Sequence, residues 1–113
     1  MVQVEVLAHN SEYCFRKEFQ LSAVPQPGFM ITLLDGRVEL YVKWVKQNLE
    51  RDCYGVFCDA TIEKLLQLHQ SHTGWRTSEP GKFENDRTVQ KAAVTLEKGR
   101  QRVAQITQQY QNK

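Results

Sequence analysis

The chain has 113 residues, of which 41% are hydrophobic and 25% are charged. These values are typical of one soluble globular domain and exclude a collagen, a disordered tail or a low-complexity linker. The 15 basic and 13 acidic side chains give a formal net charge of +2, which is too small to indicate a partner.

No apolar run approaches the ~18 residues needed to cross a bilayer. The first ten residues, MVQVEVLAHN, alternate and lack the apolar block of a signal peptide. The three cysteines are an odd number, which does not suit a disulfide framework. We therefore expect a cytoplasmic protein that has no membrane segment.

Alternation of apolar and polar residues predicts strands in the first half of the chain. Val2, Val4 and Val6 share one face of the first strand. A polar break at 9–11 separates it from a second alternating run, which ends at the prolines and glycine of 25–28 because proline cannot donate to a sheet ladder.

The strongest local pattern is the Asp35-Gly36 pair, which stands between the alternating runs FMITLL and RVELYV. This pair is typical of a two-residue primed turn, whose central residues both need positive φ. Pairing Leu33 with Val38 and continuing outward gives one apolar face, which a slip of one residue would destroy. The sequence therefore predicts a hairpin with this register.

After Val42 the pattern fits two structures, because the apolar residues up to Leu49 also have helical spacing. The Asp-Gly turn and the β-branched residues favour a strand to about Val45, followed by a helical turn or loop through Asp52. The next six residues, CYGVFC at 53–58, predict a fifth strand.

From Asp59 onward the apolar period lengthens to three or four residues, and Asp59 itself is a suitable N-cap. We predict a helix over 59–72, a loop over 73–85 and a long helix over 86–111. The predicted fold class is α+β: an antiparallel, partly barrel-like meander of four or five strands over 2–58, followed by these two helices, in a single domain covering 1–113.

The last helix carries a heptad repeat, formed by Val89, Ala92, Leu96, Gly99, Val103, Ile106 and Tyr110. A helix of about 25 residues is ~37 Å long, which is more than so small a sheet needs as cover. We therefore expect the first half of the seam to dock on the sheet and the second half to contact a partner. A homodimer would use the seam residues Leu96, Gly99, Val103, Ile106 and Tyr110.

Basic residues form a row on another face of the same helix. Arg87, Lys91, Lys98 and Arg102 project within about 60° of one another and about 120° from the seam. Residues 85–113 contain six basic and two acidic side chains, a balance of +4, whereas residues 1–75 balance at −2. Such a row suits a phosphate backbone or an acidic protein surface, but it is also typical of a solvated helix face.

Two cysteines and two histidines suggest a zinc site. Thiolate and imidazole are the ligands that zinc prefers, and the order of the residues resembles a small zinc finger, although the spacings are shorter than usual. The alternative is a buried pair of cysteines with two surface histidines. The tentative zinc ligands are Cys53, Cys58, His69 and His72.

Most of the aromatic residues alternate with the aliphatic faces, so core packing is their expected use. Exposed aromatics on a five-stranded sheet can also stack unpaired bases. Trp44 and Trp75 are the two without an obvious buried register.

The sequence lacks a phosphate-binding glycine loop and a dinucleotide fingerprint, and we expect no enzyme activity and no cofactor. The sequence favours a small binding or regulatory protein that engages a protein partner through the long helix and the loop 73–84. The alternative is a nucleic-acid-binding module that uses the basic row and is stabilised by zinc. The expected contact residues are Trp75, Arg76, Arg87, Lys91, Lys98 and Arg102.

Overall fold

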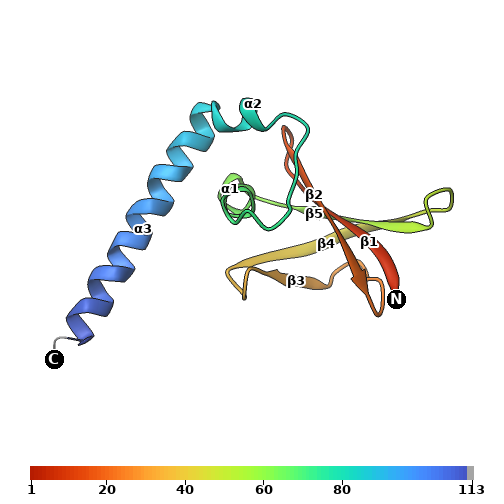
Figure 1. Cartoon of the computed structure of the whole chain (residues 1–113), viewed down its shortest axis with the longest axis horizontal. Helices are drawn as coiled ribbons and strands as arrows, with labels where there is room; N and C mark the ends of the chain where they lie inside the picture. The colour runs from red at the N-terminus through yellow and green to blue at the C-terminus, as the bar shows by residue number, and fades with distance from the viewer. Residues whose placement is uncertain (112–113) are drawn as a thin grey trace.

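The computed structural model describes the backbone of residues 1–111 and the side chains of residues 1–109. Five strands form one sheet in the order β2-β1-β5-β4-β3, and three helices follow in sequence (Figure 1). The strands are β1 (Val2–His9), β2 (Cys14–Leu21), β3 (Met30–Leu33), β4 (Val38–Asn48) and β5 (Cys53–Asp59). The helices are α1 (Ile62–Gln70), α2 (Pro80–Glu84) and α3 (Arg87–Gln111).

The α+β class is confirmed, but the sheet is mixed and not a purely antiparallel meander. β1 pairs with β5 in parallel, with Val6 opposite Val56. The segment 22–29 carries the chain from β2 at one edge to β3 at the other, so these two strands do not pair. Two hairpins then bring β5 back beside β1 in the same direction and curl the sheet into a half-barrel. Alternation could not reveal this pairing, because it indicates the face of a residue and not the direction of the neighbouring strand.

The predicted hairpin is confirmed in register and turn. Leu33 lies opposite Val38, and the central residues Asp35 and Gly36 have φ of 57° and 84°. The following strand continues to Asn48, beyond the expected end near Val45, because it pairs with β5 along this whole stretch. A bulge shifts the register between Val42 and Trp44.

The core lies between the inner face of the sheet and α1. The sheet contributes Val4, Val6, Ala8, Phe15, Val38, Leu40, Val42, Val56 and Cys58, and α1 contributes Leu65, Leu66 and Leu68. Helix α1 begins later than predicted, because Asp59 still belongs to β5 and pairs with Tyr41. The N-cap is Thr61, whose hydroxyl accepts a hydrogen bond from the Lys64 amide.

The segment between α1 and α3 is bound closely to the sheet. It contains the short helix α2 within the predicted loop 73–85. Trp75 is buried and its ring centroid lies 6.0 Å from that of Phe19. Arg76 exchanges backbone hydrogen bonds of 2.9 and 3.0 Å with Arg16 of β2. Phe83 of α2 is completely buried. This segment therefore connects two helices and also covers one end of the sheet.

Helix α3 packs with its first half against α1 and α2, not against the sheet as expected. Val89 and Ala92 are buried there, and Leu96 is half-buried. The sheet is out of reach because α1 already occupies its inner face. The C-terminal part of α3 extends away from the sheet (Figure 1). No helix in the described part of the chain is long and apolar enough to cross a membrane.

Candidate functional site

The end of α3 is the part of the described chain that is least engaged with the fold. Every residue from 97 to 109, which we call the free half of α3, is exposed. Val103 and Ile106 expose 64% and 54% of their surface. Residues three positions apart lie side by side on a helix, so these two side chains form one apolar strip in solvent.

In the structure, the expected seam has a covered part that ends at Leu96 and an exposed part that follows it. Val89, Ala92 and Leu96 are covered by the body of the protein, whereas Gly99, Val103 and Ile106 are exposed. Tyr110, the last predicted seam residue, belongs to α3, but its side chain lies outside the described residues. The uncovered seam thus continues the line of the core beyond the point where the protein itself supplies a cover.

The basic row lies on the solvent side of α3, as expected for either of its two readings. Arg87, Lys91, Lys98 and Arg102 are all exposed, and none of them forms an ion pair within the described residues. Val94 interrupts the row on the same face and is 55% exposed.

Arg100, unlike the residues of the basic row, has partners within the protein. Its guanidinium lies 3.8 Å from the Glu97 carboxylate and donates a 3.0 Å hydrogen bond to the Gln70 side chain on α1. It therefore braces the free half where it leaves the body.

The tentative zinc ligands are not brought together. Cys58 is fully buried on the inner face, and Cys53, five positions away on the same strand, faces outward at a distance of ~17 Å. His69 contacts the Glu84 carboxylate at 2.8 Å, and His72 is exposed in the turn after α1. Among the described residues, no group of three or more histidine, cysteine or acidic side chains is placed to hold a metal ion.

The two expected contact residues before α3 differ in placement. Trp75 belongs to the core and is only 8% exposed, so it presents no surface to a partner. The sequence around Trp75 has no periodic pattern from which this burial could be predicted. Arg76 is exposed and lies beside β2.

Sequence reasoning missed a residue that holds α3 in place. Asp86 directly precedes α3, and its carboxylate accepts a 2.8 Å hydrogen bond from the Thr88 amide. Its other oxygen accepts a 2.6 Å hydrogen bond from the Tyr13 hydroxyl. This bond raises the pKa of Tyr13 to about 12 and, together with the Thr88 amide, holds the pKa of Asp86 below its ordinary value. Nothing in the sequence links two residues 73 positions apart.

Comparisons of the chain with protein-family models, curated proteins and solved structures found no match. The class that the fold defines is an α+β protein with a mixed half-barrel sheet and a projecting helix.

Proposed function

We propose that this chain is a small, non-enzymatic binding or regulatory protein that engages a protein partner through the free half of α3. The observation that carries the proposal is the exposed apolar strip of Val103 and Ile106 on a helix anchored at its other end. Isolated helical segments of this length are marginal in water, so a partner that covers the strip would also stabilise the helix.

The charges of the free half favour an acidic partner. Residues 97–109 contain Lys98, Arg100 and Arg102 against Glu97 alone, which gives three positive and one negative charge. A partner that offers an apolar groove with acidic rims would bury the strip and neutralise Lys98 and Arg102. A second copy of the chain that paired through the same face would instead bring the basic flanks together, with Glu97, already paired with Arg100, as the acidic side chain of each free half.

The three described cysteines are all unpaired, which supports a reducing cytoplasmic setting for this interaction. The two sides of α3 would then have separate roles. The seam would provide the buried area, and the basic row would help to orient the partner during association.

Site-specific photo-crosslinking tests the proposal. A benzophenone amino acid at position 106 should crosslink a protein partner in extracts of the native host, because Ile106 lies on the seam. The same group at position 101 is the matched control, since Gln101 lies about 180° from the seam on the same helix. The crosslink at 106 should disappear when Val103→Glu is also present.

The outcomes are distinct. A crosslinked partner rich in acidic residues at 106 and none at 101 supports the proposal. Crosslinks only between two copies, together with a dimer in sedimentation, would replace the partner by a homodimer. No difference between positions 101 and 106 contradicts an interface on this face.

A second function is favoured by the unpaired basic row: nucleic-acid binding along α3. Replacing Lys98 and Arg102 by Gln separates the two functions. Duplex affinity that falls with salt, and whose logarithmic slope decreases by about 0.9 for each contact removed, would indicate phosphate binding. An unchanged affinity would exclude it.

A further inference from the structure

The outer face of the sheet, opposite α1, carries a second surface that the proposed function does not use. Outward-facing residues of β1, β2, β4 and β5 form it, together with the β4–β5 turn and the strap at 76–78. An aromatic pair lies at one end of this surface and a cluster of arginines at the other.

The aromatic pair consists of Trp44 and Phe57. The bulge in β4 shifts the register so that Trp44 lies opposite Phe57 on β5. Their rings are stacked, with centroids 3.8 Å apart and planes only 3° from parallel. Trp44 is nevertheless 43% exposed. One face of the indole therefore rests on Phe57, and the exposed part of the indole is available for stacking with another flat ring.

Three arginines from three different segments line a groove of about 450 Å³. Arg16 extends from β2, Arg51 from the β4–β5 turn and Arg76 from the strap. The hydroxyl-bearing residues Thr77 and Ser78 complete the rim. Guanidinium groups that converge in this way suit phosphate oxygens, which they bind through paired N–H donors.

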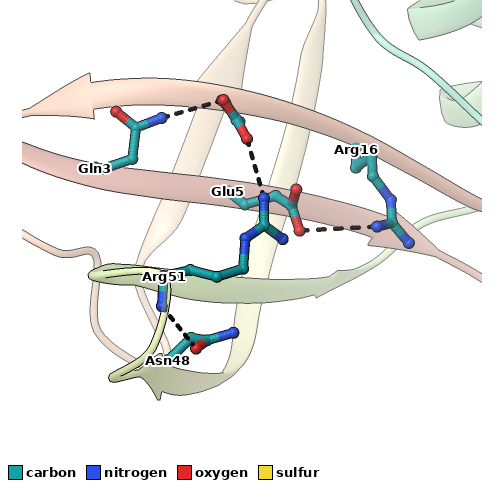
Figure 2. A network of polar contacts seen from close by, with 6 residues as sticks. Gln3, Glu5, Arg16, Asn48 and Arg51 are labelled. Atoms are coloured by element: carbon teal, nitrogen blue, oxygen red, sulfur yellow. Dashed lines mark hydrogen bonds and ion pairs between the residues drawn. The ribbon is translucent and has the colours of Figure 1, made fainter.

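Two of these arginines each have one glutamate nearby, which leaves most of their donors unused. Figure 2 shows Arg51 reaching across the sheet, and its guanidinium lies 3.7 Å from the Glu18 carboxylate. Arg16 lies 4.0 Å from Glu5. Charge-assisted hydrogen bonds are about 2.7–2.9 Å long, and each guanidinium has five donors. Most of the donors of the two arginines are thus available to a ligand.

Arg76 adds a positive charge that no described acidic side chain pairs with. The groove therefore carries three positive and two negative charges.

The arginine groove and the aromatic pair belong to one continuous surface. A neighbouring depression shares Arg51 with the groove and continues to Lys46 and Phe57. Another shares Cys14 and Ser78 with the groove and continues to Trp44. A chain-like ligand can follow the second path from the guanidinium groups to the exposed indole, whereas the first path ends at Phe57.

We propose that this outer face binds single-stranded nucleic acid, with a base stacked on Trp44 and the neighbouring phosphates held by Arg16, Arg51 and Arg76. Aromatic platforms beside a basic groove are the means by which proteins bind unpaired strands. A duplex hides the faces of its bases, so it can reach the arginines but not the indole. The proposal does not depend on the partner of α3.

Binding of a fluorescein-labelled 12-nucleotide oligothymidylate tests the proposal. Trp75 is buried, so base stacking should quench the emission of Trp44 selectively. Trp44→Leu should weaken the affinity at least about fivefold, the lower end of the effect of removing one stacking contact, whereas Trp44→Phe should retain most of it. Arg51→Gln and Arg76→Gln should each reduce the salt slope by about 0.7.

Controls of equal charge lie elsewhere on the surface. Arg37→Gln and Lys82→Gln, both at exposed positions, should leave the affinity unchanged, and melting curves should show that all variants are folded. A duplex of the same length should bind more weakly than the single strand.

Three results would overturn the proposal. The first is an affinity for the single strand that Trp44→Leu does not change. The second is a loss of affinity on replacing Lys98 and Arg102 that equals the loss on replacing the arginines, which would move the site to α3. The third is equal binding of an oligoglutamate peptide of the same length, which would indicate a general anion surface.

Discussion

The Tyr13 hydroxyl donates a 2.6 Å hydrogen bond to the Asp86 carboxylate and so joins the β1–β2 turn to the start of α3. The same carboxylate caps the helix through the Thr88 amide. The Asn10 side chain in turn accepts a hydrogen bond from the Tyr13 amide at 2.7 Å. Asp86 therefore ties the start of α3 to the β1–β2 turn, 11 residues before the free half begins.

Replacing Tyr13 by Phe should lower the stability of the protein in a pH-dependent way. The folded pKa of Asp86 lies below its ordinary value of 3.8, so its contribution is present above about pH 3.8 and is lost as the pH falls through the lower folded value. The folded pKa of Tyr13, about 12, lies above its ordinary value of 10.0. Its contribution is therefore present below pH 10 and is lost as the pH rises through about 12.

Urea denaturation of the wild type and of Tyr13→Phe at a series of pH values measures this effect. The difference in unfolding free energy should be largest and constant between about pH 4 and pH 10 and should shrink on both sides. Tyr41→Phe is the matched control, because Tyr41 is 60% exposed. A difference that does not vary with pH would show that the Tyr13–Asp86 bond contributes nothing.

Phe83→Ala should be among the most destabilising single substitutions. Phe83 is fully buried, and its ring contacts Tyr13 and Phe15 edge-to-face at centroid distances of 5.0 and 4.9 Å. Losing a buried phenylalanine costs about 3–5 kcal/mol, a large part of the stability of a small domain. Chemical denaturation measures the loss, and Lys82→Ala on the exposed side of α2 should change the stability by less than about 0.5 kcal/mol. Equal effects of the two variants would mean that α2 is not anchored by this ring.

The parts of the fold that sequence could predict are those that local pattern controls. The Asp35-Gly36 turn requires two positive φ angles, and only one register of the flanking strands gives a continuous apolar face. The heptad likewise predicted a long last helix. The parallel pairing of β1 with β5 was beyond prediction, because it depends on where the segment 22–29 crosses the fold and not on any side-chain pattern.

The candidate functional residues show the same distinction between features that local pattern controls and features that depend on the path of the chain. The exposure of Val103 and Ile106 follows from the length of the helix relative to the body, which the sequence already indicated. The burial of Trp75 depends on the path of an irregular segment. The stacking of Trp44 on Phe57 depends on a bulge in β4. No pattern in the sequence predicts the burial of Trp75 or this stacking.

Gly99→Ala should strengthen the free half of α3. A Cβ at this position would meet nothing within 4 Å, and alanine favours a helix over glycine by about 1 kcal/mol. Hydrogen exchange of the amides of residues 97–109 should therefore become slower, by up to about fivefold. Gly36→Ala is the informative contrast, because Gly36 also has open space but a φ of 84°, so the same change should destabilise the hairpin. Exchange that Gly99→Ala leaves unchanged would mean that the free half is not limited by its own helix stability.

Ending the chain after Lys98 should leave the body of the protein folded. The removed residues up to 109 are all exposed, and Arg100 contributes one hydrogen bond to Gln70 on the surface. The melting temperature should therefore change by no more than about 4 °C, the range expected for surface changes in a domain of this size, while the helical circular dichroism falls. The shortened chain should also fail to compete with the full chain for the partner that the benzophenone at position 106 captures. A much larger drop in melting temperature, together with a dependence on protein concentration in the full chain, would mean that the free half stabilises the body through contact between two copies.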